Sequence, residues 1–79
     1  MVIFMVLNLG ERLKELRLSH DLKQSDMANV LEISTRGYRH YELAEREPNL
    51  TTLIFLADYF NVSLDYLVGR TDDPTFEKK

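Results

Sequence analysis

The two histidines of this 79-residue chain have the side chains that are best suited to proton transfer near neutral pH. His20 and His40 belong to different segments, and neither lies at a spacing typical of a catalytic or metal-binding motif. The chain has no cysteine, which excludes a thiolate nucleophile, a thiolate zinc site and a disulfide framework. We therefore expect neither an enzyme nor a protein that holds a metal or a cofactor.

A second group of side chains has the chemistry of nucleic-acid recognition. On a helical wheel of about 100° per residue, Arg36, Arg39 and His40 lie on one side of the segment 34–43, and two tyrosines lie on the other. Charge alone does not distinguish this face from an ordinary solvated one. The formal net charge of −3 weakens non-specific attraction to DNA, but the acidic excess follows residue 46 and leaves room for a local basic face.

Apolar spacing and capping residues predict five helices that would position these side chains. Asn8 and Glu11 form a capping box for a first helix, which ends near His20 and Asp21. A second helix spans 24–31, and a third begins at the cap Ser34 and extends to about residue 43. The inward residues of these segments are Leu9, Leu13, Leu16, Met27, Ala28, Leu31, Ile33, Tyr38 and Tyr41.

Two further helices complete the expected bundle. Pro48 and Asn49 open the fourth, and Asn61 ends it in a left-handed conformation. Ser63 caps a short fifth helix that Gly69 terminates. The apolar face of the fourth helix is Leu50, Leu53, Ile54, Leu56, Ala57 and Phe60, and that of the fifth is Leu64, Leu67 and Val68.

The pair of helices at 24–31 and 34–43 resembles the Cro/C1-type (xenobiotic-response-element-like) helix-turn-helix family. The resemblance rests on Gln24, Ala28, the apolar turn 31–33 and Ser34, and it extends over residues 9–74. It also includes the strings RLKELR, YELAEREPNLTTL and LADYFNVSLDYLVGRTDDP. The resemblance implies an all-α, compact five-helix lambda-repressor-like domain at 9–69, between an apolar leader at 1–8 and a polar tail at 70–79.

Four positions depart from the family pattern. Glu32 stands where glycine is common, and a left-handed conformation there would cost about 1–2 kcal/mol. Lys23 replaces the usual threonine cap, and Ala44 replaces the glycine that often follows the third helix. Tyr38 is bulkier than the usual aliphatic residue. Lys23 and Ala44 are the departures that bear on the entry and exit angles of the third helix.

The resemblance implies that the third helix enters the major groove of double-stranded DNA. Thr35, Arg36 and His40 are then the candidates for base contacts, since arginine can bind guanine O6 and N7 together. Candidates for contacts to the DNA backbone are Gln24, Ser34, Gly37, Arg39 and Arg46. For Gly37, close approach to DNA and lack of space beside a neighbouring helix remain equal alternatives.

Family members often brace the reading helix with an ion pair, here Arg17 and Glu42. One copy reads few base pairs, so we expect a homodimer on a pseudo-palindromic operator. The predicted dimer interface is the fifth helix, through Leu64, Tyr66, Leu67 and Val68. The leader, with Val2, Ile3, Phe4, Val6 and Leu7, is either a second contact as a short strand or a disordered extension preceding a start at Met5.

These features predict a sequence-specific DNA-binding transcriptional regulator, acting as a repressor. The alternative is a protein-interaction module, such as an antitoxin or adaptor with a vestigial DNA face. The apolar opening at 1–7 is far shorter than the roughly 20 residues that span a bilayer, and it lacks a basic region or a cleavage site. We therefore expect a soluble, cytoplasmic protein that does not enter a membrane.

Overall fold

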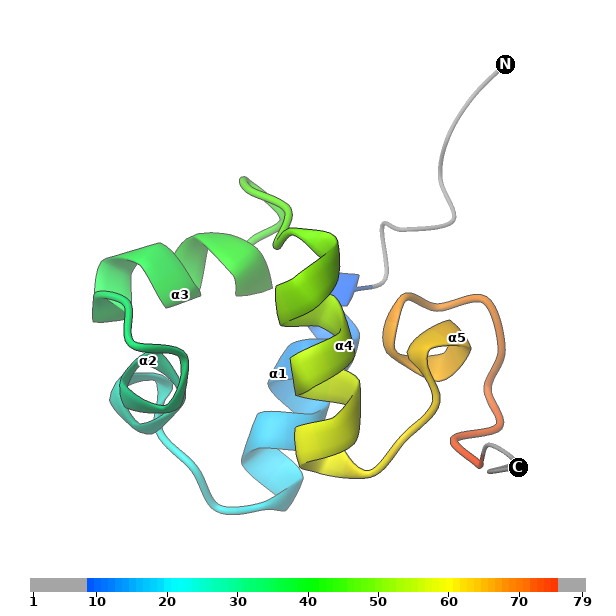
Figure 1. Cartoon of the computed structure of the whole chain (residues 1–79). Helices are drawn as coiled ribbons and strands as arrows, with labels where there is room; N and C mark the ends of the chain where they lie inside the picture. The colour runs from blue at the N-terminus through cyan, green and yellow to red at the C-terminus, as the bar shows by residue number, and fades with distance from the viewer. Residues whose placement is uncertain (1–8, 76–79) are drawn as a thin grey trace.

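The computed structural model describes residues 9–75, and within this range it contains five α-helices and no strand. The helices are α1 (Leu9–Ser19), α2 (Gln24–Leu31), α3 (Thr35–Glu42), α4 (Leu50–Phe60) and α5 (Leu64–Leu67). Figure 1 shows α1 behind α4, with α2 and α3 on one side of this pair and α5 on the other. The predicted all-α fold is confirmed. The proposed cap at Asn8 and the leader strand lie outside the described residues.

Side-chain caps begin three of the helices, as the sequence predicts. Ser34 Oγ accepts a hydrogen bond from the Gly37 N–H at 2.9 Å, and Ser63 Oγ accepts one from the Tyr66 N–H at 3.0 Å. Asn49 Oδ1 accepts from the N–H of Thr52 at 2.8 Å. Each such cap contributes about 1 kcal/mol to stability. The starts of α3, α4 and α5 are therefore encoded locally.

The helix ends use left-handed residues, which turn the chain sharply. Asn61 has a φ angle of 58°, as the sequence predicts, and Asp21, Glu32 and Ala44 have φ angles of 58°, 59° and 62°. Glu32 and Ala44 have no side chain that favours this conformation, so each costs about 1–2 kcal/mol. At Glu32 this turn sets the short connection between α2 and α3, where the Ile33 N–H donates to the Ala28 carbonyl at 3.0 Å.

The core lies where all five helices meet. Its fully buried large side chains are Leu13, Met27, Tyr38, Leu56 and Leu67, and partly buried residues such as Leu31, Leu53 and Tyr41 pack around them. Every buried side-chain nitrogen or oxygen of the described residues has a hydrogen-bond partner. Within residues 9–75, no helix combines the length and the apolar character needed to cross a bilayer.

Three of the predicted inward residues are exposed instead. Ile33 lies in the turn before α3, where its side chain is 37% exposed. Leu50 and Ile54 are 63% and 46% exposed because the inner face of α4 consists of Leu53, Leu56, Ala57 and Phe60, and they lie at its edge. The apolar pattern therefore predicts a wider buried face for α4 than the one that its neighbours cover.

The burial of Leu67 corrects the predicted dimer interface. Its side chain is fully buried in the core, so it is not available to a second copy. Leu64 and Tyr66 also pack against the core, although they remain partly exposed. A four-residue helix can expose little once one of its apolar side chains anchors it to the bundle.

The segment after α5 folds back onto the helices. The Ser63 N–H donates to the Pro74 carbonyl at 2.8 Å. Arg12 of α1 donates to the Thr71 carbonyl at 3.3 Å, pairs with Asp72 at 3.2 Å, and places its guanidinium 3.9 Å from the centre of the Tyr66 ring. The division of the chain at residue 69 stays a prediction, and these contacts attach the next residues to the helical domain.

Candidate nucleic-acid interface

α3 presents a polar face to solvent. Thr35, Arg36 and Arg39 are exposed, whereas Tyr38 on the opposite side of the helix is fully buried. Within residues 9–75, neither of these arginines forms an ion pair with an acidic side chain, and neither does Arg46 in the loop that follows. The arginines of this surface therefore keep their hydrogen-bond donors available.

His40 is placed differently from the other candidates for base contacts. Its side chain is 33% exposed, and its Nδ1 lies 2.6 Å from Glu45 Oε1. Backbone bonds from the N–H groups of Glu45 and Arg46 to the His40 carbonyl, at 2.9 and 3.3 Å, hold this loop against the end of α3. A base contact by His40 would have to compete with Glu45.

Gly37 lies in the first turn of α3, behind the cap. A Cβ atom added there would lie 3.2 Å from Ser34 Oγ and 3.9 Å from Ile33 Cδ1, with no atom of another helix within 4 Å. Lack of space beside a neighbouring helix is therefore not the reason for this glycine. The remaining interpretation, close approach of the α3 backbone to DNA, stays a prediction.

Glu42, at the end of α3, accepts hydrogen bonds from three other side chains. Arg17 Nε and Nη2 donate to its two carboxylate oxygens at 2.6 and 3.1 Å, the Tyr38 hydroxyl donates to Oε2, and Gln24 Nε2 donates to Oε1 at 3.1 Å. The side chains of Arg17 and Glu42 are only 9% and 3% exposed. This cluster joins α1, α2 and α3, and we call it the Glu42 cluster.

The protonation states in the Glu42 cluster follow from burial and pairing. Burial by itself would raise the pKa of Glu42, but the hydrogen bonds from Arg17, Tyr38 and Gln24 outweigh it and hold the pKa below its ordinary value. The hydrogen bond with Glu42 raises the pKa of Arg17, and burial together with Glu42 raises that of Tyr38. At neutral pH the cluster is thus a charged pair with a neutral tyrosine.

Gln24 begins α2, where the first backbone N–H groups have no partner within the helix. Its hydrogen bond to Glu42 uses one of its two amide hydrogens and leaves the other for a further acceptor. The Lys23 N–H donates to Asp26 Oδ2 at 2.8 Å, which provides half of a capping box without a side-chain cap from Lys23. The start of α2 is therefore oriented by contacts that leave donors for a phosphate.

Gly10 in α1 is a residue that the sequence analysis missed. It is buried, and a Cβ atom there would collide with the backbone carbonyl of Glu42. A glycine inside a helix costs about 0.5–1 kcal/mol relative to alanine. This cost is the feature of the sequence that could have indicated a special role for Gly10. The partner of Gly10 belongs to another helix, so the sequence did not identify it.

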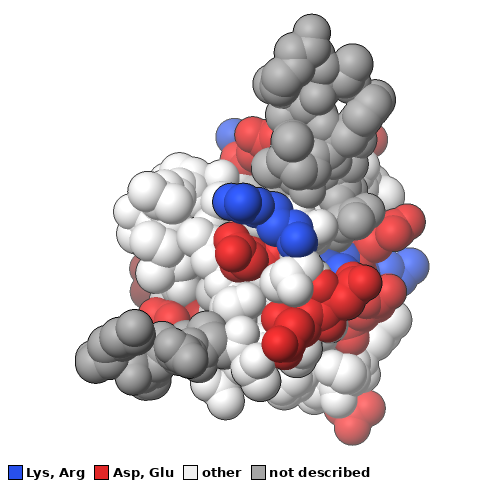
Figure 2. Space-filling view, turned by 90° about the vertical axis from the view of Figure 1, so that its right-hand side faces the viewer, with Lys and Arg blue, Asp and Glu red and all other residues white. Residues whose placement is uncertain are grey.

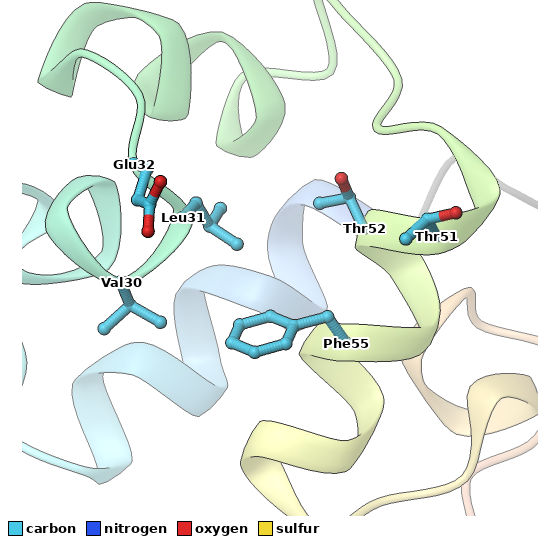
Figure 3. A pocket seen from close by; sticks show the side chains of 6 residues that line it. All are labelled: Val30, Leu31, Glu32, Thr51, Thr52 and Phe55. Atoms are coloured by element: carbon cyan, nitrogen blue, oxygen red, sulfur yellow. The ribbon is translucent and has the colours of Figure 1, made fainter.

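Two other surfaces hold none of the candidate DNA contacts. Figure 2 shows the face that lies to the right in Figure 1, where α5 and residues 70–75 lie, and acidic side chains form its larger coloured patches. A hollow of about 260 Å³ lies between the end of α2 and α4, lined by Val30, Leu31, Glu32, Thr51, Thr52 and Phe55 (Figure 3). None of the residues that line the hollow is a candidate DNA contact.

Comparison with known proteins agrees with this geometry. A helix-turn-helix family model matches residues 13–67. The HTH-type transcriptional regulator YobD of Bacillus subtilis, itself named as uncharacterized, is 39% identical over 64 residues, which cover 81% of this chain and 57% of the relative. The regulator ImmR of Bacillus subtilis is 38% identical over 66 residues, covering 84% and 52%.

A phage protein is also among the relatives. The cryptic phage CTXphi transcriptional repressor RstR of Vibrio cholerae is 34% identical over 64 residues, covering 81% of this chain and 57% of the repressor. The chain thus spans a little more than half the length of these relatives. The matched range includes α2, α3 and the turn between them, and the chain belongs to the helix-turn-helix family.

Proposed function

We propose that this chain binds double-stranded DNA sequence-specifically and represses transcription, with α3 in the major groove. The observation that carries the proposal is the exposed face of α3, where Arg36 and Arg39 have no acidic partner among residues 9–75. On the opposite face, Tyr38 and Glu42 attach α3 to the rest of the bundle. A braced helix with free arginine donors is suited to reading base edges. The relatives are named as transcriptional regulators and a phage repressor, which favours this function over a protein-interaction module or an enzyme.

The proposed contacts divide into two kinds. Thr35 and Arg36, near the start of α3, contact bases, and His40 joins them where DNA displaces Glu45. The proposed contacts to phosphates come from the start of α2, from α3 with its cap, and from the loop after α3. They are Gln24, Ser34, Gly37, Arg39 and Arg46. Phosphate contacts set the register of α3, and base contacts supply the specificity.

We also propose that two copies bind a pseudo-palindromic operator, with half-sites about 34–36 Å apart. Because Leu67 is buried, the proposed dimer surface consists of Leu64 and Tyr66 of α5, Val68 directly after α5, and the exposed Leu50 and Ile54 of α4. α4 and α5 pack against each other, so these apolar side chains belong to adjoining elements. A DNA-bound repressor of this kind would act in the cytoplasm.

Selection from random duplexes tests the proposed function. The chain is incubated with random duplex fragments, the retained fragments are sequenced, and affinity for the enriched sequence is measured at several salt concentrations. We expect an enriched palindrome and a steep loss of affinity with salt, because several phosphates are neutralised. No enriched sequence, or an affinity that does not depend on salt, would refute the proposal.

A variant at the base contact sharpens this test. Arg36→Ala should weaken discrimination at one base pair by about 1–3 kcal/mol while the other positions keep theirs. Arg70→Ala is the matched control, because it removes the same charge from an exposed side chain near α5, where Arg70 pairs with Asp65 at 3.7 Å. Equal weakening of all sequences by Arg36→Ala would assign Arg36 to a phosphate instead.

A further inference from the structure

α1 and α3 touch backbone to backbone at Gly10. A Cβ atom at this position would collide with the carbonyl oxygen of Glu42, and it would lie 3.0 Å from both the Glu42 carbonyl carbon and the Tyr41 carbonyl oxygen. These atoms belong to the last turn of α3. The absence of a side chain at Gly10 is therefore what allows this end of α3 to pack directly on α1.

The same residue of α3 is held by α1 a second time. Arg17 follows Gly10 by two helical turns, so both lie on the same face of α1. Gly10 receives the Glu42 backbone, and Arg17 binds the Glu42 carboxylate through Nε and Nη2. One face of α1 thus fixes Glu42 at its main chain and at its side chain, and these two points define where the end of α3 lies.

A methyl group at residue 10 could not be accommodated by a side-chain rotation, because the obstructing atoms are backbone atoms of α3. The start of α3 is attached to α2 through the Ile33 N–H, which donates to the Ala28 carbonyl, and the middle of α3 is held by the buried Tyr38. The easiest adjustment is for the last turn of α3 to pivot away from α1. Recognition sites work only when their side chains are held within about 0.5 Å of the productive geometry.

We infer that Gly10 is a positioning residue for DNA recognition, which sets the tilt of α3 without touching DNA. The inference rests on the proposed function, since it assigns to α3 the reading of bases. Its consequence is that Gly10→Ala lowers the ratio of operator affinity to random-DNA affinity by roughly tenfold, as expected when a base contact is misaligned. Affinity for random DNA changes little, because phosphate contacts tolerate small shifts and carry no base information.

The test uses Gly10→Ala and, as a matched control on the same helix, Leu18→Ala. Leu18 is exposed, and its replacement changes neither charge nor the contact with α3. Affinities of the full chain for the selected operator and for a random duplex are measured by fluorescence anisotropy. Amide chemical shifts of the unbound protein are measured by NMR in parallel. We expect Gly10→Ala to shift the amides along 35–44 and to lower the affinity ratio, while Leu18→Ala leaves both unchanged.

Other outcomes separate this inference from the proposed function. Amide shifts confined to 9–14, with an unchanged affinity ratio, would show that α1 yields instead of α3 and would overturn the inference. A wild-type protein that prefers no sequence would refute the proposed function, while the NMR comparison would still decide whether Gly10 places α3. If Gly10→Ala is unfolded in buffer, the comparison is repeated with trimethylamine N-oxide, which favours the compact state. A variant that stays unfolded even then would overturn the inference, because Gly10 would be required for folding itself.

Discussion

Glu42→Ala is expected to cost about 3–5 kcal/mol of unfolding free energy, because it leaves a buried charge without its partner. The carboxylate accepts from Arg17 at 2.6 and 3.1 Å, from Gln24 at 3.1 Å, and from the Tyr38 hydroxyl. In the variant, the guanidinium of Arg17 keeps only its 3.0 Å bond from Nη1 to the Leu22 carbonyl. The Tyr38 hydroxyl, at a fully buried residue, loses its acceptor as well.

This loss is large compared with the stability of so small a domain. Natural domains have about 0.05–0.15 kcal/mol of unfolding free energy per residue, which is about 4–12 kcal/mol for this chain. Glu42→Ala should therefore remove a large part of this free energy, and at the lower end of the range folded and unfolded forms would be about equally populated. Removing both charges, as in the double variant Arg17→Met with Glu42→Gln, should recover much of the loss. A glutamine still accepts from Tyr38, and no uncompensated charge remains.

Urea unfolding followed by far-ultraviolet circular dichroism at pH 7 measures the unfolding free energies of the wild type and of these variants. The exposed pair Arg70 and Asp65, with side chains 66% and 61% exposed, supplies the control, and Arg70→Ala should cost less than about 1 kcal/mol. If Glu42→Ala also cost less than about 1 kcal/mol, Arg17 and Glu42 would behave as a surface pair and the reasoning would be refuted. A double variant no more stable than Glu42→Ala would likewise contradict it.

The Glu42 cluster should also make the unfolding free energy depend on pH, because the pKa of Glu42 is lower in the folded state than in the unfolded state. The stabilisation by the Glu42 carboxylate is complete above the unfolded pKa of about 4.3, and it is lost as the pH falls through the folded-state pKa. Comparing urea midpoints of wild type and Glu42→Gln between pH 3 and pH 7 checks this, and parallel curves would contradict it. Gln24→Ala should weaken operator and random DNA alike in anisotropy titrations, since a phosphate contact carries no base information; a changed sequence preference at unchanged overall affinity would reject that role. Ile54→Asp should shift the dimer to monomer in sedimentation runs while the helical circular dichroism spectrum stays the same, because Ile54 is exposed; a dimer of unchanged strength would exclude the α4 surface. A chain that begins at Met5 should sediment like the full chain if α4 and α5 form the interface, and loss of the dimer in that chain alone would move the interface to the leader.

Local chemistry explains most of what the sequence predicted correctly. The caps at Ser34, Asn49 and Ser63 are bonds to a backbone N–H three residues later, so they depend only on residues nearby in the chain. The left-handed ends at Asp21 and Asn61 likewise express the preferences of single residues in tight turns. Together with the apolar spacing, these signals were sufficient to place the five helices and the buried side of α3.

Packing between helices decided what the sequence could not. Leu50 and Ile54 have the same apolar character as Leu53 and Leu56, and only the position of neighbouring helices leaves them exposed. Leu67 is buried because the surrounding helices cover its side chain. Hydrophobic periodicity identifies a helix face that avoids water, but it does not say whether the chain itself or a second molecule covers that face.

The candidate site shows the same division. Helical spacing separates Arg36 and Arg39 from Tyr38, so the sequence predicts a helix within 34–43 that has cations on one side. The pairing of His40 with Glu45, the hydrogen bond of Gln24 to Glu42 and the close approach of α3 to Gly10 are visible only in the packed structure. The contacts of Gln24 and Gly10 join different helices, and that of His40 depends on how the loop folds back on α3. Side-chain direction and backbone approach are set once the segments are packed, so no local pattern in the sequence specifies them.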